Sequence, residues 1–463
     1  MEFVERYGNM YRYVPAWRRW LKWDGQRWDD DSTGRVYDVI RRLVWERVAG
    51  GLDERPTANA SFVWGVERLA RTDQSIVVLP EQLDSDPWLL NTPSGIVDLR
   101  TGGAREHDPL ALLTKITRAA PDAAQGAELW ATFLRNITLG DVELESYLRR
   151  LAGYMLTGVT TEDVIIFLFG DGANGKSSFA EALERAMGRY AKVFPSEVLM
   201  LSKVERHPTE LAQFQGIRFA LTSEIPVAAA WNDSRLKSLT GDAKISARVM
   251  RGDPFEFERS HKMMILGNHL PRLNDINDAI RRRMQAVPFR AAFPPGVATD
   301  VRERLKSEAL CAVLAWAIQG AAEWKRLGTS PPESVRTLTD DYLAEQDDIA
   351  QWIDERCERI PTGLEQSSRL HLDYATWCKQ QGVPAKSNRA LSRYLAPIFG
   401  KPVPRAAGNI FVGLKLRSGG CGPSSIIDRT RARTHTYENG EPSTTSTALS
   451  DDAVERPLEE ETR

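Results

Sequence analysis

The sequence predicts an α/β protein with a nucleotide-binding core between a mixed helical N-terminal region and a small C-terminal domain. Three observations lead to this fold class. Short apolar strands alternate with helical patterns from residue 163 to about residue 293, as is typical of layered α/β folds. One of these strands runs directly into a glycine-rich phosphate loop. Residues 345–416 combine helical patterns with a final pair of apolar strands, which indicates a separate small domain.

Length and composition favour a soluble protein of several domains. The 463 residues suffice for about three domains, and the net charge of −2 argues against a chain that coats DNA over its whole surface. No apolar run is long enough to cross a bilayer, and the first thirty residues lack the apolar core of a signal peptide, so we expect a cytoplasmic protein without a membrane partner. The four cysteines are scattered without C-x-x-C spacing, which favours neither a zinc cluster nor a disulfide framework: Cys311, Cys357, Cys378 and Cys421.

The first predicted domain, residues 1–127, is rich in tryptophan. We expect its aromatic side chains to pack a small core rather than form a base-stacking surface: Trp17, Trp20, Trp23 and Trp28. A hairpin is expected over residues 88–99. The run Asp29-Asp30-Asp31 is interpreted as a surface turn, although closely spaced carboxylates also occur in two-metal sites.

The remaining elements follow in order. Residues 128–162 repeat apolar positions at helical spacing, and we expect a helical oligomerisation segment that leads into the core domain, residues 163–330. The core strands are expected at residues 164–169, 217–222 and 263–267. Residues 345–416 resemble a winged helix, which binds duplex DNA in some proteins and other proteins elsewhere. The Ser-, Thr- and acid-rich tail, residues 417–463, is predicted to be disordered.

The phosphate loop has the G-x-x-x-x-G-K-[ST] spacing after a buried strand. Backbone N–H groups of such a loop face a polyphosphate, the lysine reaches its outer phosphates and the following hydroxyl ligates Mg²⁺. The chain is therefore expected to bind ATP and Mg²⁺, with Lys176 and Ser177 in these two roles. The full set of predicted nucleotide-binding residues is Gly170, Asp171, Gly172, Ala173, Asn174, Gly175, Lys176, Ser177 and Ser178.

Three further groups of residues suit ATP hydrolysis. Glu224 follows a strand and is placed to orient water or help to hold Mg²⁺. Asn268 follows the next apolar strand and is a candidate γ-phosphate sensor, although an Asn before a proline-containing loop also suits a turn. The cluster Arg281-Arg282-Arg283 fits an arginine finger that reaches a neighbouring subunit, or a solvated helix end.

A basic stretch lies between these motifs. Residues 232–290 contain twelve Lys/Arg and seven Asp/Glu, an excess that suits sequence-independent contact with phosphates, or a solvated basic face. The expected DNA-binding residues are Lys237, Lys244, Arg248 and Arg251.

This ordered set resembles superfamily 3 helicases, specifically the helicase half of phage and plasmid primase-helicases related to the poxvirus primase-helicase. The motifs are residues 170–177, 210–212, 218–224, 236–251, 268–271, 282–283 and 288–289, with N-terminal matches at 20–28, 95–99 and 153–154. The resemblance implies an AAA+-like P-loop core, a ring that is usually a hexamer, and ATP-driven movement along single-stranded DNA from 3′ to 5′.

By position, the resemblance implies roles for Lys176 and Ser177 on phosphates and magnesium, Glu224 as the acidic motif, Asn268 as the sensor, and Arg282 or Arg283 as the finger. Residues 244–251 match its DNA-gripping hairpin. Two departures stand out: Ser223 precedes Glu224 where the family often has two acids, and Arg281 stands where an aromatic residue is common. No primase module is visible, so a separate primase or polymerase is an expected partner, together with single-stranded and forked DNA.

Three other functions share the phosphate loop. A nucleotide-gated origin binder or loader would hydrolyse ATP without releasing a strand. A small-molecule kinase would need an acceptor pocket and has no use for the basic stretch. A silent DNA-binding scaffold is disfavoured because Gly175-Lys176-Ser177 is intact.

Overall fold

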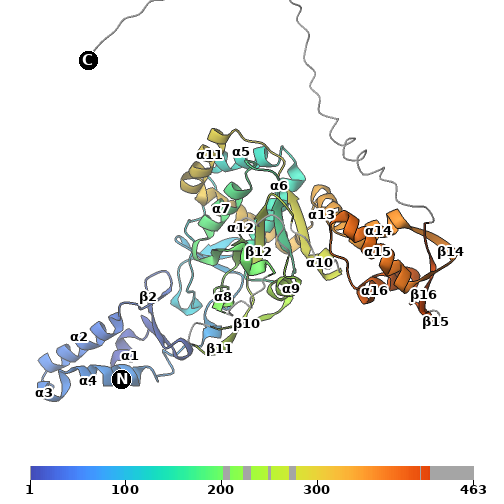
Figure 1. Cartoon of the computed structure of the whole chain (residues 1–463). Helices are drawn as coiled ribbons and strands as arrows, with labels where there is room; N and C mark the ends of the chain where they lie inside the picture. Colours follow the sequence, from blue (N-terminus) through green and yellow to red (C-terminus); the bar gives the residue numbers. More distant parts are fainter. Residues whose placement is uncertain are drawn as a thin grey trace, which may run out of the picture. The chain divides into compact units, whose positions relative to one another are not determined.

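The computed structural model describes residues 2–201, 209–222, 231–248, 252–270, 278–406 and 408–417. The chain divides into two compact units, residues 1–351 and 352–463 (Figure 1). Three predicted features lie outside the described residues: Glu224, Arg251 and the tail after residue 417. Within the described residues, no helix has both the length and the apolar character that a membrane span requires.

The N-terminal part of the first unit contains two small antiparallel sheets. One has the order β1-β2-β3 and the other β4-β5-β6. Four helices accompany the first sheet, and α2 and α4 contact each other. The elements are α1 Glu2–Tyr7, β1 Tyr11–Val14, β2 Arg19–Trp23, β3 Trp28–Asp30, α2 Arg35–Ala49, α3 Glu54–Thr57, α4 Ala60–Ala70, β4 Leu89–Thr92, β5 Gly95–Asp98 and β6 Gly103–Arg105.

The N-terminal tryptophans mostly pack inward, as expected. Trp20 is buried in a cluster with Phe3 and Tyr11, and Trp28 is buried in a neighbouring cluster. Trp23 is half-buried against Trp28, and only Trp17 is 37% exposed. The packing interpretation of these rings is therefore supported for three of the four.

The three consecutive aspartates each have a different structural partner. Asp29 accepts hydrogen bonds from Arg27 and Arg189, Asp30 pairs with Arg19, and Asp31 accepts from the backbone N–H groups at the start of α2. Their carboxylates are thus engaged in holding the chain. The surface-turn prediction was wrong for Asp29 and Asp30, which lie in β3 and pair with β2, whereas Asp31 follows the strand.

The centre of the first unit is a five-stranded sheet in which every neighbouring pair is parallel. Its order is β13-β7-β12-β9-β8. The strands are β7 Ile165–Phe169, β8 Ala191–Phe194, β9 Phe219–Thr222, β12 Lys262–Gly267 and β13 Met284–Pro288. The three strands expected from the sequence are present within a residue or two, while β8 is an edge strand that the sequence did not reveal.

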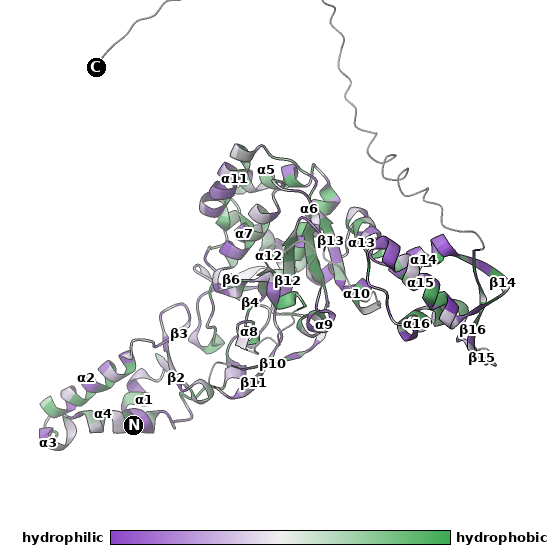
Figure 2. Ribbon diagram, viewed as in Figure 1, coloured by the Kyte–Doolittle hydropathy of each residue, from purple (hydrophilic) through white to green (hydrophobic). Residues whose placement is uncertain are grey.

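Side chains of β7 alternate between two buried cores, because successive residues of a strand point to opposite faces. Ile166 and Leu168 belong to a core that also contains side chains of helices α5, α6, α7 and α12. Ile165 and Phe167 belong to a second core with residues of α9, α10 and α13. Figure 2 shows the apolar strands between these helices. The helices are α5 Ala127–Ile137, α6 Val142–Leu156, α7 Lys176–Met187, α8 Thr209–Ala212, α9 Asp233–Gly241, α10 Asp278–Arg283, α11 Pro295–Glu308, α12 Leu310–Leu327 and α13 Glu333–Glu345.

A two-stranded antiparallel hairpin lies between α9 and β12 in the chain. It pairs β10, Lys244–Arg248, with β11, Pro254–Glu258, and α8 contacts β10. Ile245, Ala247 and Phe257 are buried, whereas the alternate residues are exposed.

The second unit is a mixed domain with a three-stranded antiparallel sheet of order β14-β16-β15. Helix α14, Asp348–Arg356, runs into it across the division between the units. Helix α15 contacts both α16 and the sheet. The other elements are β14 Cys357–Gln366, α15 Ser367–Gln381, α16 Asn388–Phe399, β15 Val403–Arg405 and β16 Gly408–Leu416. The sequence did not predict β14, because its charged and proline-containing residues show no continuous alternation.

Candidate nucleotide-binding site

The predicted phosphate loop joins the carboxyl end of β7 to the first turn of α7. Gly175 immediately precedes α7 and has a φ of +88°, a left-handed conformation that favours glycine. A Cβ on Gly170 would lie 2.2 Å from the Phe289 carbonyl oxygen, so a side chain there would clash with the backbone that follows β13. These two glycines are therefore required by the local packing of the loop, whatever its ligand.

The Lys176 ammonium group folds back onto the loop. Its Nζ donates to the carbonyl oxygens of Gly170 at 2.5 Å and Asp171 at 3.0 Å, and to Asn174 Oδ1 at 2.9 Å. Lys176 is only 5% exposed. These acceptors keep the cation next to the N-terminus of a twelve-residue helix, where the unpaired N–H groups and helix dipole favour an anion.

The strand-like segment after β13 fixes the far side of the loop. Asn174 Nδ2 donates to the Phe289 carbonyl oxygen at 3.0 Å, and the Phe293 N–H donates to the Ala173 carbonyl oxygen at 2.9 Å. Asn174 is buried, so it acts here as a structural tie between the loop and this segment. Between these contacts lies Arg290, an exposed cation that belongs to none of the motifs recognised in the sequence.

Asn268 lies at the same edge of the sheet as the loop. Gly267, the last residue of β12, is paired with Phe169 of β7, so Asn268 and Gly170 follow neighbouring strand ends. Asn268 is half-buried. The parallel strand β9 ends at Thr222 one position further along the sheet, and the chain continues from there towards Glu224, which is not described. The carboxyl ends of adjacent parallel strands are where open α/β sheets bind ligands.

The residues of the loop fit a triphosphate with its magnesium ion. Gly172 has no atom within 4 Å of where a Cβ would stand, and Asp171, Gly172 and Ala173 are exposed, so the loop backbone is accessible. Ser177 and Ser178 are half-buried in the first turn of α7. A hydroxyl in this place suits Mg²⁺, which prefers oxygen ligands and commonly retains several waters.

The arginine cluster lies at the opposite edge of the sheet. Arg281, Arg282 and Arg283 end α10 and immediately precede β13, whose first residue is paired with the first residue of β7. The five residues of β7 separate that edge from the phosphate loop by about 16 Å, at 3.3 Å per residue. These arginines therefore do not reach the loop of their own chain.

The three arginines differ in their surroundings. Arg281 pairs with the buried Asp347 at 3.2 Å, and Arg283, whose side chain is 15% exposed, donates to Asp163 at 3.2 Å. Asp163 also accepts from Arg259 at 3.0 Å. A Cβ on Gly241 would lie 2.6 Å from Arg283 Nη2, so this glycine makes room for the guanidinium. Arg282 is the exposed residue between two arginines that are tied to aspartates.

Two other cations at this amino edge are buried and form no ion pair with a carboxylate among the residues that the structure describes. Arg218 donates to the carbonyl oxygens of Leu156 and Leu89, both at 2.8 Å, and Lys262 donates to the Thr157 carbonyl oxygen. Burial lowers the pKa of Arg218, and burial together with Arg218 and Arg259 lowers the pKa of Lys262 well below its ordinary value. The signal for both was present in the sequence, since each is a basic residue directly before or at the start of an apolar strand.

The predicted DNA-binding residues are distributed over α9 and the hairpin. Lys237 is half-buried on α9, whereas Lys244 and Arg248 lie on the exposed face of β10. That face also presents acids, because Lys244 is paired directly with Glu258. Arg248 Nε donates to the Gly252 carbonyl oxygen at 2.8 Å, within the hairpin. Two of the cations counted in the basic stretch, Arg259 and Lys262, are buried and do not contribute to an exposed face.

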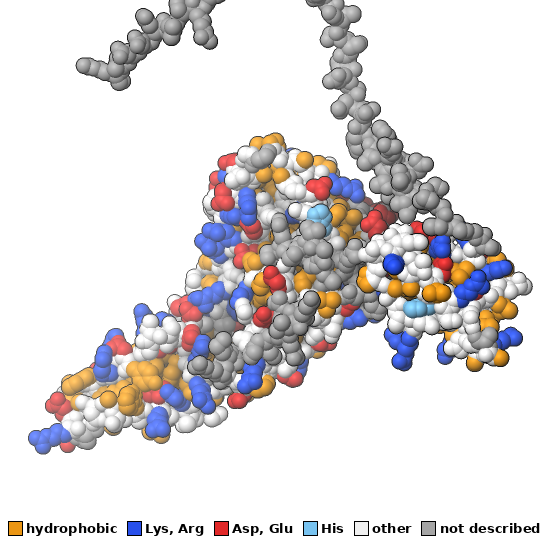
Figure 3. Space-filling view, in the orientation of Figure 1, with side chains coloured by type: hydrophobic (Ala, Val, Ile, Leu, Met, Phe, Trp, Pro, Cys, Tyr) orange, Lys and Arg blue, Asp and Glu red, His pale blue; other side chains and the backbone are white. Residues whose placement is uncertain are grey.

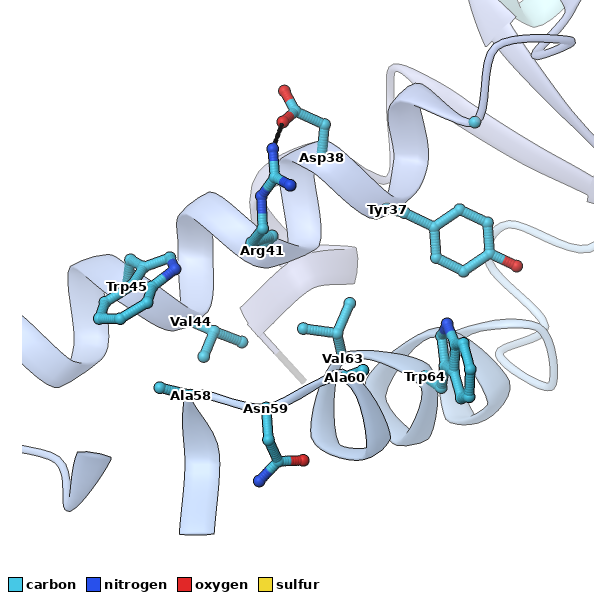
Figure 4. Close-up of a pocket in the computed structure, with 11 residues that line it drawn as sticks. Tyr37, Asp38, Arg41, Val44, Trp45, Ala58, Asn59, Ala60, Val63 and Trp64 are labelled. Atoms are coloured by element: carbon cyan, nitrogen blue, oxygen red, sulfur yellow. Dashed lines mark hydrogen bonds and ion pairs between the residues drawn. The ribbon is translucent and has the colours of Figure 1, made fainter. Parts of the chain in front are cut away.

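A separate hollow of about 480 Å³ lies between α2 and α4 (Figure 4). Trp45 and Trp64 line it and are 50% and 60% exposed. The charged residues of its lining, Asp38 and Arg41, bond to each other, so the hollow offers mainly apolar and aromatic surface. No pattern in the sequence indicated this hollow.

Two family matches cover much of the first unit. Residues 2–139 match the family described as "D5 N terminal like", and residues 168–283 match a family of unknown function, DUF5906. The second match begins within β7 and ends at Arg283, so it contains the phosphate loop, Asn268 and the arginine cluster.

The similar proteins are viral. "Putative helicase L207/L206" of Acanthamoeba polyphaga mimivirus is 28% identical over 258 residues, which is 53% of this chain and 26% of that protein. "Putative helicase 022R" of Frog virus 3 (isolate Goorha) is 25% identical over 277 residues, 54% of this chain and 28% of that protein. The chain thus matches about a quarter of the length of these relatives. The resemblance to helicases that the motifs indicated is confirmed by these matches.

A solved structure gives a further match of low similarity. The A form apo structure of the NrS-1 C terminal region aligns with 88% of this chain and 96% of its own, at a TM-score of 0.46 and 12% sequence identity.

Proposed function

We propose that this chain is an ATP-dependent DNA helicase of superfamily 3 that assembles into a ring, hydrolyses ATP between neighbouring copies and translocates on single-stranded DNA. The observation that supports this most is the geometry of the sheet edge. There, a glycine-rich loop with Lys176 folded onto it and a half-buried Asn268 follow adjacent parallel strands. The relatives are named putative helicases, which supports the proposal that ATP hydrolysis drives the unwinding of DNA.

The loop residues have distinct tasks in this proposal. Backbone N–H groups at the start of α7 bind the phosphates, and Lys176 exchanges the carbonyl oxygens of Gly170 and Asp171 for phosphate oxygens. Ser177 would hold Mg²⁺, which supplies charge neutralisation on the β- and γ-phosphates. Asn268 positions the attacking water at the same edge, and Glu224 accepts its proton.

Hydrolysis in this proposal needs a second copy of the chain. Transition-state charge on the γ-phosphate is commonly stabilised by an arginine, and the cluster at residues 281–283 lies about 16 Å from the phosphate loop of its own chain. Arg282 is the member that we assign to this role, because the resemblance places the finger at Arg282 or Arg283, and Arg282 is exposed whereas the Arg283 side chain is only 15% exposed. A ring, most simply a hexamer, brings the amino edge of one copy to the carboxyl edge of the next.

Subunit mixing tests this arrangement. Lys176→Ala and Arg282→Ala chains should each have little ATPase activity, and a mixture should regain part of it, since some junctions then combine an intact loop with an intact arginine. Arg283→Ala is the matched control and should retain most of its ATPase activity, because Arg283 binds Asp163. If assembled mixtures stay inactive, or Arg283→Ala is as inactive as Arg282→Ala, the assignment of Arg282 is wrong.

Strand displacement on forked DNA separates a helicase from a loader. A helicase releases the labelled strand with ATP and Mg²⁺, whereas an origin-binding loader hydrolyses ATP and releases none. ATP turnover that is indifferent to DNA would contradict both, and would favour a small-molecule kinase.

The hairpin residues are assigned to single-stranded DNA. Lys244→Ala should lower the stimulation of ATP turnover by single-stranded DNA without changing the unstimulated rate, because Lys244 is exposed and distant from the phosphate loop in the chain. Lys325→Ala, on the exposed surface of α12, is the matched control. If single-stranded DNA stimulates the ATP turnover of both variants as much as that of the wild type, the hairpin does not bind the DNA. Lys237, Arg248 and Arg251 belong to the same proposed surface.

A further inference from the structure

The second unit differs from the rest of the chain in charge. Residues 352–417 contain eleven Lys/Arg and five Asp/Glu, a net charge of +6 in a chain whose total is −2. The five acids all precede residue 374, and residues 374–417 contain eight Lys/Arg and no acid. Figure 3 shows blue side chains distributed over this unit, with few red ones on the visible face.

The acids of this unit are mostly engaged within it. Asp373 binds Arg356 and Trp352, Glu355 accepts from Trp377, and the buried Glu365 pairs with Arg369. The later cations are different. None of the following makes an ion pair with a residue that the structure describes, and all but Lys386 are exposed: Lys379, Lys386, Arg389, Arg393, Lys401 and Arg405. Their charges therefore face solvent without internal neutralisation.

Helix α16 presents two of these cations on one face. Arg389 and Arg393 are four residues apart and exposed, so they lie one above the other on the helix surface. Leu391 and Leu395 are buried on the opposite side, where α16 contacts α15 and β16. The N-terminus of α16 is fixed by Ser387, whose side chain accepts from the Ala390 N–H.

We infer that six cations form a basic face that binds double-stranded DNA, with α16 as the element that enters or lies along the major groove: Lys379, Lys386, Arg389, Arg393, Lys401 and Arg405. The inference goes beyond the proposed motor activity and does not depend on ATP. An exposed helix with cations at i and i+4 suits the wide major groove of B-form DNA, which admits an α-helix, whereas the major groove of duplex RNA is too narrow.

The aromatic residues of this unit argue against single-stranded DNA as its ligand. Single-strand binders stack bases on exposed rings. None of the six aromatic side chains in residues 352–417 is exposed: Trp352, Tyr374, Trp377 and Phe411 are buried, and Tyr394 and Phe399 are half-buried. Phe399 is further covered by the Arg359 guanidinium, 5.3 Å from the ring centre.

Fluorescence anisotropy of the full chain with a labelled duplex, without nucleotide and with EDTA, tests the site. Arg389→Gln/Arg393→Gln should bind about tenfold more weakly at moderate salt, and the slope of log affinity against log salt should fall by about 2, one for each lost phosphate contact. Arg326→Gln/Arg336→Gln removes two exposed arginines from the first unit and should leave affinity and slope unchanged. Lys401→Gln/Arg405→Gln, a second pair within the basic face, should reproduce the loss if the helix variant fails to fold.

Two results would overturn the inference: equal weakening by the basic-face pair and the control pair, or tighter binding of the basic face to single-stranded DNA or duplex RNA than to duplex DNA. The outcome is independent of the proposed motor. Lys176→Ala should bind the duplex as the wild type does, and Arg389→Gln/Arg393→Gln should retain its ATPase activity. A protein-docking role for this face predicts no duplex affinity at all.

Discussion

The two edges of the central sheet accommodate positive charge in different ways. At the carboxyl edge, Lys176 is held by carbonyl oxygens of a loop whose backbone is exposed, so a phosphate can replace those oxygens. At the amino edge, Arg218 and Lys262 are buried and donate to carbonyl oxygens of the fixed backbone around the end of α6. A cation that donates to carbonyl oxygens can bind a ligand only if the ligand's oxygens can replace those carbonyls. Where the carbonyls belong to fixed, buried backbone, the cation has a structural role.

The difference has a physical origin. A buried cation without exchangeable partners loses its hydration permanently, which is why burial lowers the pKa of both Arg218 and Lys262. Arg218 and Lys262 each offset part of the cost of losing their hydration, because they donate hydrogen bonds to backbone carbonyl oxygens at the ends of secondary-structure elements. The same residue types thus stabilise the fold at one edge and are assigned to ATP at the other.

The largest expected effect is at Lys176. Lys176→Ala should reduce ATPase activity on the order of 10²–10³-fold, since one preorganised charge at the transition state is removed. The free energy of unfolding should change little in comparison, because two of the three acceptors belong to the exposed Asp171 and the half-buried Gly170. Steady-state ATP turnover and a denaturant titration measure the two quantities; a large loss of stability would contradict the contrast between the edges.

Arg218 should show the reverse. Arg218→Met keeps the volume but leaves the carbonyl oxygens of Leu156 and Leu89 without this donor, which should lower the free energy of unfolding by about 2–4 kcal/mol. ATP turnover per folded molecule should be retained. Arg304→Met, at a side chain 47% exposed, is the control and should be near neutral in urea denaturation. Similar stability of both variants would show that the amino-edge cation is dispensable.

His261, also buried at the amino edge, makes stability depend on pH. It precedes Lys262, its Nε2 lies 3.0 Å from the Leu239 carbonyl oxygen, and burial, aided by Arg259, lowers its pKa to about 3. In the unfolded chain this histidine has a pKa of 6.5. Between about pH 6.5 and pH 3 it is therefore protonated in the unfolded chain and neutral in the folded chain. This contribution to stability is complete above pH 6.5 and falls as the pH decreases, by up to about 1.4 kcal/mol per pH unit.

Urea denaturation of the wild type at pH 7 and pH 5 measures this slope. His261→Phe should lose less stability over the interval, whereas His107→Gln, at a half-buried histidine of the N-terminal part, should behave as the wild type. An unchanged slope in His261→Phe would mean that the folded chain protonates this histidine without cost.

The smallest expected effect is at Arg290. Arg290→Gln removes an exposed cation from the segment that bonds to the phosphate loop and should raise the KM for ATP about fivefold, corresponding to about 1 kcal/mol, with kcat nearly unchanged. Arg326→Gln is the control. A fall in kcat with constant KM would instead place Arg290 among the groups that stabilise the transition state.

The core strands and the glycine-rich loop were predictable from the sequence because their signals are local. A continuous apolar run followed by glycines at fixed spacing specifies β7 and the loop without reference to distant residues. The basic stretch was less informative. Its cations include the buried Arg259 and Lys262 and the aspartate-bound Arg281 and Arg283, so the count of charges did not describe a surface.

The α/β class of the core and the place of the glycine-rich loop followed from the sequence, because the conformation of such a loop depends on adjacent residues; phosphate binding by its residues stays a prediction. Tertiary structure alone decided which residues share an edge of the sheet. Strand order brings Asn268 beside Gly170 and sends Arg282 to the far edge, and helix packing separates buried cations from exposed ones. Such arrangements follow from the pairing of segments that lie far apart in the chain, and the spacing of residues does not encode them.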